Sequence, residues 1–354
     1  MEAVYLLPIR RSVVDPAELD DLAGYVRRLA RILPVVVVDA SPPAVRACHV
    51  AAWGRSARTV VPPGHPAGVN GKVVGVHAGL DATDQPLVVV GDDDVRYDGA
   101  SLRGVLAALG TADLVLPQNV FVPSPWHARW DSARSLVNRA FGHDYGGTVA
   151  FRRSALPSGW YDPQVLFENL ELERTVLARG GRVRVLDVAV PRRPPTVRHF
   201  AGQRVRQAYD SLAQPGRLLV ELALAPLLAA CALAGTRSGR ASRWPAWALL
   251  GTVLGGAVAL AEKGRRRGAG TDLFPRSAAV WAPLWVAERA VCVWGAVGWR
   301  LVGGVPYAGA RLRVAAHSAA ELRRRCARGG TSSMTGHDRP AGPGVSPAST
   351  ARSG

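Results

Sequence analysis

The sequence predicts an α/β fold, in which a mostly parallel, Rossmann-like sheet carries a ligand site and apolar helices follow it. Short apolar runs rich in β-branched residues alternate with segments of helical spacing over roughly the first 215 residues. One such run, Leu87–Gly91, leads directly into Asp92, Asp93 and Asp94. From Leu218 onward the composition changes to long, Ala-rich apolar stretches. These three observations indicate a ligand-binding sheet domain followed by a helical region.

The chain begins with a strand–helix–strand unit. Residues 4–9 and 34–39 are apolar runs that suit buried strands, and 15–33 places its apolar residues at helical spacing. A helix between two strands makes the strands parallel neighbours. The second strand ends in Asp39.

Three adjacent carboxylates follow the strand Leu87–Gly91. They repel one another, so they need compensation by a cation or by bulk water. Ligands of open α/β sheets bind beyond the carboxyl ends of the strands, where Asp39 would also lie. Oxygen ligands of this kind suit Mg²⁺ or Mn²⁺ shared with a phosphate, so Asp92 and Asp94 are the predicted metal ligands. The alternatives are a solvated acidic turn for the triplet and a loop-capping role for Asp39.

A helix is predicted to start at Gly71-Lys72. A lysine in the first turn is poorly placed for the helix dipole, which favours anions there. A bound phosphate explains it, because helix N-termini and lysine both attract one. A solvated Lys72 is the alternative.

Further segments complete the sheet domain. Residues 113–118 and 183–190 are predicted strands, and 167–177 is a predicted helix. Residues 145–153 are predicted as a further strand, in which Gly146 and Gly147 would let the backbone approach a sugar closely or would form a simple bulge.

Together these motifs resemble inverting family 2 glycosyltransferases of the GT-A fold. The resemblance covers about the first 215 residues and implies that Asp39 contacts the base of a nucleotide-sugar. It also implies that Asp92 and Asp94 hold the divalent cation, with Asp93 between them, and that Gly146-Gly147 borders the acceptor.

The sequence departs from the family where the catalytic base is expected. The family carries a Glu-Asp pair at the start of a helix, and its Asp deprotonates the acceptor hydroxyl. This chain has Glu168 followed by Asn169, and an amide cannot accept the proton. Glu168 is the favoured base, Glu171 is a second candidate, and an impaired enzyme is the third possibility.

The segment around residue 205 resembles the Q-x-x-R-W motif of membrane-embedded members such as cellulose synthase, hyaluronan synthase and ceramide glucosyltransferase. Gln203 and Arg206 match the motif, and Arg204 between them is also predicted to bind the substrate. Gln207 stands where the family has Trp, which favours transfer of a single sugar over processive polymerisation. A basic helix attracted to lipid headgroups is the alternative.

Residues 216–305 form the predicted membrane region of two or three spanning or interfacial helices. Its apolar stretches are 218–235, 244–261 and 278–304, with Arg-rich turns between them and Glu221, Glu288 and Arg289 inside or near them. A buried helical hairpin is the alternative. The positive-inside rule places the sheet domain in the cytoplasm, on a plasma membrane. Residues 306–330 are predicted as a basic juxtamembrane segment with an interfacial helix at 311–328, and 331–354 as a disordered tail.

The chain has 44 Lys and Arg residues against 27 Asp and Glu residues, and its four cysteines are widely separated in the sequence. Neither a zinc site nor a disulfide framework follows from that spacing. The cations gather beside the apolar stretches instead of interleaving with aromatics, which argues against nucleic-acid binding.

The predicted function is metal-dependent transfer of a sugar from a nucleotide-diphosphate sugar, with UDP-sugars favoured, to a lipid or lipid-linked acceptor. The alternative is a catalytically weak nucleotide-sugar-binding scaffold in a membrane complex, which Asn169 and Gln207 motivate.

Overall fold

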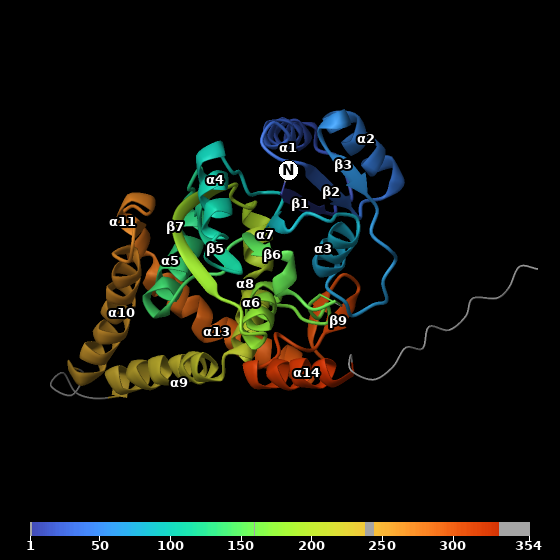
Figure 1. The fold of residues 1–354 in the computed structure, drawn as a ribbon. Coiled ribbons are helices and arrows are strands. Elements are labelled where there is room, and N and C mark those ends of the chain that lie inside the picture. Colours follow the sequence, from blue (N-terminus) through green and yellow to red (C-terminus); the bar gives the residue numbers. More distant parts are fainter. Residues whose placement is uncertain (1, 159, 238–243, 333–354) are drawn as a thin grey trace, which may run out of the picture.

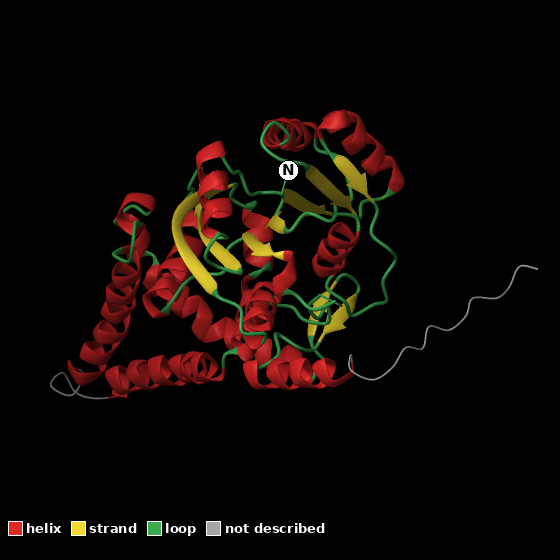
Figure 2. Cartoon of the chain, viewed as in Figure 1, coloured by secondary structure: helices red, strands yellow, loops and turns green. Residues whose placement is uncertain are grey.

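The computed structural model describes residues 2–158, 160–237 and 244–332. A seven-stranded sheet with the order β3-β2-β1-β4-β6-β5-β7 lies at its centre (Figures 1 and 2). The strands are β1 (Ala3–Ile9), β2 (Val35–Asp39), β3 (Arg58–Val60), β4 (Leu87–Gly91), β5 (Leu114–Phe121), β6 (Thr148–Arg152) and β7 (Val183–Arg192). Strand β6 runs antiparallel to its neighbours β4 and β5, and the other pairs are parallel. The predicted α/β domain with a mostly parallel sheet is confirmed.

Helices cover both faces of this sheet. They are α1 (Pro16–Leu29), α2 (Pro43–Trp53), α3 (Gly71–Asp81), α4 (Gly99–Ala108), α5 (Trp126–Phe141) and α6 (Glu168–Ala178). In β1, Tyr5 and Leu7 pack in the apolar cluster that contains α1 and α4, whereas Leu6 packs in the cluster that contains α3 and α6. Burial on both faces explains why the strands are apolar almost throughout.

Side-chain caps fix where three of the helices begin. Asp15 caps α1, and Asp98 forms a capping box with Ser101 at α4. Asn70 caps α3 by accepting a hydrogen bond from the Lys72 backbone N–H (3.1 Å). The cap therefore sets the direction in which the first turn of α3 presents Lys72.

The apolar C-terminal half forms helices that pack beside α5. They are α9 (Pro215–Arg237), α10 (Trp244–Arg265), α11 (Gly270–Leu273), α12 (Ser277–Val280) and α13 (Ala282–Leu301). Leu136 of α5 shares an apolar cluster with Ala257 and Ala261 of α10 and with Trp285 of α13. Two segments are long and apolar enough to cross a membrane, Pro215–Leu233 and Ser277–Leu301. The second of the three predicted stretches, now α10, is not among them.

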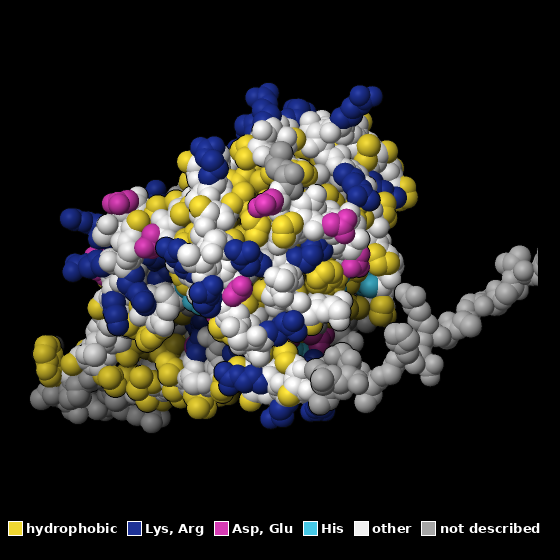
Figure 3. Space-filling model, viewed as in Figure 1, with side chains coloured by type: hydrophobic (Ala, Val, Ile, Leu, Met, Phe, Trp, Pro, Cys, Tyr) yellow, Lys and Arg dark blue, Asp and Glu magenta, His cyan; other side chains and the backbone are white. Residues whose placement is uncertain are grey.

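Large apolar side chains remain exposed on these helices. They include Leu219 and Val220 on α9, Trp247 on α10 and Trp294 on α13. Figure 3 shows hydrophobic side chains gathered along the lower left edge of the molecule, over α9. This surface differs from the sheet domain, whose visible face carries many Lys and Arg side chains.

The C-terminal segment differs from its prediction. Instead of one interfacial helix at 311–328, the chain forms a hairpin of β8 (Val305–Tyr307) and β9 (Ala310–Leu312), and α14 (Ala319–Ser332) begins later. The hairpin returns to the sheet domain, where Leu166 and Phe167 donate backbone hydrogen bonds to the segment that follows β9. Residues 306–330 are therefore packed on the first 215 residues rather than set apart from them. The predicted disordered tail lies outside the described residues, apart from its first two, which end α14.

A buried ion pair joins α6 to this returning segment. Glu171 is fully buried, and its Oε1 lies 2.9 Å from Nδ1 of His317 while its Oε2 accepts the His317 backbone N–H (2.7 Å). The hydrogen bond from Glu171 raises the pKa of His317 above its ordinary value. The pair ties the C-terminal segment to the helix that borders the candidate site.

Replacing His317 by Ala is expected to destabilise the fold by about 3–5 kcal/mol below pH 6, because it leaves the Glu171 carboxylate buried without its cation. Since the pKa of His317 is raised in the fold, its contribution is complete below its ordinary value of 6.5 and is lost as the pH rises through the raised value. Denaturant unfolding at several pH values checks this. The exposed His65→Ala variant is the control, and an equal loss in both variants, or a loss that grows with pH, contradicts the prediction.

Candidate functional site

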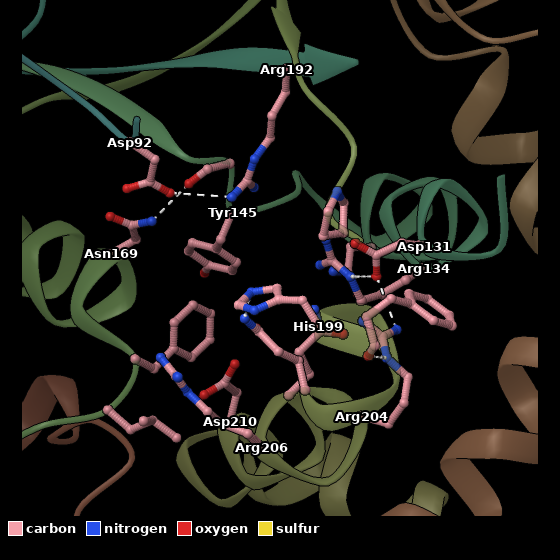
Figure 4. Close-up of a pocket in the computed structure, with 18 of the residues that line it drawn as sticks. Asp92, Asp131, Arg134, Tyr145, Asn169, Arg192, His199, Arg204, Arg206 and Asp210 are labelled. Carbon is pink, nitrogen blue, oxygen red and sulfur yellow. Dashed lines mark hydrogen bonds and ion pairs between the residues drawn. The ribbon is translucent and has the colours of Figure 1, made fainter. Parts of the chain in front are cut away.

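A polar cavity of about 290 Å³ opens beyond the carboxyl end of β4. Helices α7 (Val197–Gly202) and α8 (Arg204–Tyr209) border it. Figure 4 shows His199 and Arg206 of these helices across from Asp92 and Arg192, whereas Arg204 lies beside Asp131. Eight of the predicted site residues line it, namely Lys72, Asp92, Asp94, Gly146, Glu168, Gln203, Arg204 and Arg206. The structure thus brings eight of the predicted residues to one cavity, and four lie outside its lining: Asp39, Asp93, Gly147 and Glu171.

Protein cations compensate the acidic triplet. Lys72 Nζ lies 2.6 Å from Asp92 Oδ1 and 2.9 Å from Glu168 Oε1. Burial opposes the charge of Lys72, but these two carboxylates outweigh it and raise its pKa. The helix start was predicted to present Lys72 to a phosphate, and here it joins two carboxylates that the sequence separates widely.

Arg192 provides the second compensating charge. Its Nε lies 2.7 Å from Asp94 Oδ2 and its Nη2 lies 3.3 Å from Asp92 Oδ2. Arg192 was not among the predicted site residues, because it ends β7, far from the triplet in the sequence. The signal that could have found it is the parallel arrangement, since the last residue of β7 reaches the same edge of the sheet as the end of β4.

The carboxylates also leave room for a metal ion. Asp94 Oδ1 is buried and has no hydrogen-bond partner among the described residues, whereas its other oxygen is paired with Arg192. Burial raises the pKa of Asp94 against the opposing guanidinium. No group of three or more His, Cys, Asp or Glu side chains in the described chain could enclose an ion alone. The residues therefore fit an ion such as Mg²⁺ or Mn²⁺, which one or two carboxylates share with a phosphate ligand.

Two of the predicted aspartates face elsewhere. Asp93 forms an ion pair with Arg11 (2.7 Å). Asp39 is fully buried, with Oδ2 at 2.7 Å from His49 Nδ1 and Oδ1 accepting the Ser41 backbone N–H. The predicted contact of Asp39 with a nucleobase is not available in this structure, because His49 follows on the next helix and takes the carboxylate.

The glycine pair before β6, Gly146 and Gly147, lies against the acidic triplet at Asp92. Gly147 O accepts the backbone N–H of Asp92 (2.7 Å), and a Cβ at Gly147 would lie 2.7 Å from Asp92 Oδ2. Asn169 Nδ2 donates to Gly146 O (2.8 Å). The expected close approach at these glycines is therefore made by Asp92 itself, and Asn169 positions the loop.

Besides Asp92, Asp94 and Asp131, the cavity is lined by two more carboxylates, Glu168 and Asp210. Glu168 is paired with Lys72, and Glu171 is buried against His317 outside the cavity, so Glu171 cannot meet a substrate. The side-chain carboxyl of Asp210 makes no hydrogen bond to the other described residues. Its removal from water, followed by the charge of Glu168, raises the pKa of Asp210 to about 7. Asp210 was not among the predicted site residues, although its spacing from Gln203 and Arg206 suits one face of a helix.

The predicted Gln–Arg motif lies on a broken helix, since α7 ends at Gly202 and α8 starts at Arg204. Gln203 contacts the His199 ring at the break. Arg206 lines the cavity with its guanidinium 5.0 Å from the Tyr307 ring of the C-terminal hairpin. Arg204 is buried and bound to Asp131 (3.2 Å), which indicates a structural role.

The lining of the cavity carries seven Lys or Arg side chains and five Asp or Glu side chains. Such an excess of cations beside an acidic pair suits a polyanionic ligand that brings a divalent ion with it. Asp210 adds a carboxyl that can exchange a proton near neutral pH.

No protein-family model matches the sequence, and none of the curated proteins compared with it is similar. Among solved structures, a mannosyltransferase from Pyrobaculum calidifontis in complex with GDP-Man and Mn²⁺ is similar with a TM-score of 0.49 and 15% identity, over 83% of this chain and 87% of that chain. Glucosyl-3-phosphoglycerate synthase from Mycobacterium tuberculosis, in complex with Mn²⁺, UDP-glucose and phosphoglyceric acid, is similar with a TM-score of 0.38 and 15% identity, over 56% of this chain and 74% of that chain. With TM-scores below 0.5 and 15% identity, these likenesses assign no property to this chain.

Proposed function

We propose that the chain is an inverting, GT-A-type glycosyltransferase that uses a nucleotide-diphosphate sugar, with UDP-sugars favoured. The observation that carries this proposal is the combination, in one cavity, of the Asp92–Asp94 pair with its orphaned oxygen, an excess of cations, and Asp210 with a pKa of about 7. A diphosphate is the ligand that requires both the metal-binding carboxylates and the surrounding guanidinium groups.

The donor diphosphate lies against Lys72, Arg192 and Arg206 in this proposal. A bound Mg²⁺ or Mn²⁺, held by Asp92 and Asp94, supplies a positive charge that stabilises the departing diphosphate. Arg192 and Lys72 already neutralise these carboxylates, so the site keeps its shape before the donor arrives.

Asp210 accepts the proton of the acceptor hydroxyl. The acceptor oxygen forms a bond with the anomeric carbon while the bond from that carbon to the diphosphate breaks, and the proton moves to the Asp210 carboxylate. When the pKa of a base lies near the working pH, a useful fraction of the base is ionised and it is still basic enough to take the proton. Glu168, the base that the sequence favoured, positions Lys72 and keeps the pKa of Asp210 high through its charge.

The acceptor is a lipid or a lipid-linked molecule, and the protein is attached to the plasma membrane with the cavity on the cytoplasmic side. The exposed apolar side chains of α9, α10 and α13 support attachment, as do the two helices long enough to cross a bilayer. Gln207, where an aromatic platform is expected, supports the transfer of one sugar.

Thermal unfolding with a panel of nucleotide-sugars, each with and without Mn²⁺, tests the donor assignment. Binding raises the apparent melting temperature by mass action, so one donor is expected to stabilise the protein only when the metal is present. Asp92→Asn is expected to lose this stabilisation, whereas Asp20→Asn, on the exposed face of α1, keeps it. No metal-dependent shift with any donor overturns the proposal. Binding without turnover in the presence of lipid acceptors favours the scaffold alternative, which Asn169 still motivates.

A further inference from the structure

A second cavity of about 640 Å³ lies among the helices beside the polar one. Its walls come from α5, α9, α10 and α13 and are largely apolar, with Val137, Phe141, Val220, Leu224, Val253, Leu260 and Trp285 among the lining residues. The volume is in the range of cavities that bury most of the surface of a small ligand. Such walls suit a hydrocarbon chain.

The two cavities meet at four residues that line both of them, Asn138, Tyr145, Arg217 and Arg289. A ligand that fills the apolar cavity therefore reaches the polar cavity past two guanidinium groups. Asp210 lines the polar cavity together with Arg217 and Arg289.

Arg289 has an unusual environment at this junction. The residue is fully buried, and none of its three guanidinium nitrogens has a hydrogen-bond partner among the described residues. The Glu221 carboxylate lies 3.9 Å from its Nε, but this carboxylate already accepts a hydrogen bond from Arg217 (2.8 Å). Glu288, the preceding residue, faces Arg204 at 3.6 Å.

A buried guanidinium without acceptors is costly, because its N–H groups lose water and gain nothing in return. The neighbouring Trp285 also leaves its indole N–H without a partner. Unused donors on a cation, at the mouth of an apolar cavity, match an oxyanion that is attached to a hydrocarbon chain.

We infer that this junction binds the phosphate of an amphiphilic acceptor, whose apolar chain fills the second cavity and whose reacting oxygen reaches Asp210. The inference rests on the proposed transferase function and names its acceptor class. Arg289 and Arg217, which line both cavities, bind the phosphate, while the apolar chain lies in the second cavity and the reacting oxygen lies in the polar cavity that Asp210 lines.

The test measures binding of three short-chain lipids to the full chain in detergent by titration calorimetry. A dioctanoyl phosphodiester lipid with a hydroxylated headgroup and a monoprenyl phosphate both contain the phosphate, and dioctanoylglycerol lacks it. Tighter binding of the first or the second identifies which phosphate lipid is the source. Arg289→Met is expected to weaken binding of that lipid about 10- to 100-fold, because charge-assisted hydrogen bonds are lost. Arg276→Met, which removes an exposed cation before α12, is the control and is expected to bind as the unchanged protein does.

Melting temperature separates a binding role from a structural one. Without lipid, Arg289→Met is expected to melt about 2 °C or more above the unchanged protein, because the substitution removes a buried guanidinium that makes no hydrogen bond to the described residues. A lower melting temperature assigns Arg289 a structural role and overturns the inference. If the Met variant does not fold, Arg289→Gln provides the same comparison.

Equal binding of the neutral lipid, or unchanged binding of the phosphate lipids by Arg289→Met, also overturns the inference. So does binding of inorganic phosphate alone as tight as that of the lipids. Metal-dependent stabilisation by nucleotide-sugars is measured on the same samples. If nucleotide-sugars stabilise the protein but the lipids do not bind, only the proposed acceptor class is wrong. If the lipids bind but no nucleotide-sugar stabilises the protein, the proposed transferase function is wrong.

Discussion

Replacing Asp210 by Asn is expected to lower kcat about 100- to 10,000-fold, the range that a lost general base costs. The amide keeps the size of the carboxyl but cannot accept the acceptor proton. The measurement is release of nucleoside diphosphate from the preferred donor in the presence of an acceptor. Donor binding, followed by thermal shift, is expected to change little, since the donor diphosphate contacts other side chains.

The pH dependence tests the same assignment independently. Because the base acts in its ionised form, kcat of the unchanged protein is expected to rise with pH through about 7, the pKa of Asp210, and this rise is absent in Asp210→Asn. In Glu168→Gln the rise moves to lower pH, since one of the charges that raise the pKa of Asp210 is gone. If Glu168→Gln loses the rise while Asp210→Asn keeps it, Glu168 is the base.

Stability distinguishes this catalytic role from a structural one. The pKa of Asp210 is higher in the fold than its ordinary value of 3.8, so its favourable contribution is complete below that value and is lost as the pH rises through about 7. Asp210→Asn is therefore expected to be more stable than the unchanged protein at pH 8 and less active at the same pH. Lower stability at pH 8 contradicts this account.

Much of the fold follows from patterns within single segments. The strands at 4–9, 34–39 and 87–91, and the helix that starts near Lys72, were predictable because each is a local apolar run or helical spacing with a cap. The parallel strands then bring Lys72, Asp92 and Asp94 to one cavity, which is a consequence of topology alone.

The missing parts of the site depend on contacts between distant segments. His49 pairs with the Asp39 carboxylate, and Arg192 at the end of β7 pairs with Asp94. The hairpin at 305–312 packs beside Arg206. No local pattern indicates which partner a buried carboxylate takes, because that choice depends on the relative energies of several distant cations. The proposed role of Asp210 could not be predicted for a similar reason, since its pKa is raised by burial and by the charge of Glu168 on α6.

Arg192 and Asp94 are expected to respond to substitution in opposite directions when the metal is measured alone. Arg192 pairs with one oxygen of Asp94 and with Asp92, so a divalent ion must compete with its guanidinium for these carboxylates. Arg192→Gln is therefore expected to bind Mn²⁺ without donor about tenfold or more tightly, as a charge close to the acidic pair is removed. Asp94→Asn is expected to abolish that binding, because it removes the orphaned carboxylate oxygen.

Turnover falls in both variants despite the opposite effects on the metal. Loss of one group that stabilises developing charge costs about 100- to 1,000-fold in kcat. Arg192 would supply one such group, and an ion held by Asp94 would supply another. Electron paramagnetic resonance of Mn²⁺ measures the first effect and steady-state kinetics the second. Arg193→Gln, which removes a neighbouring cation paired with Asp21, is the control. If Arg192→Gln binds Mn²⁺ no better than this control, Arg192 does not share its carboxylates with a metal ion, and the acidic pair is then an internal ion-pair network of the protein.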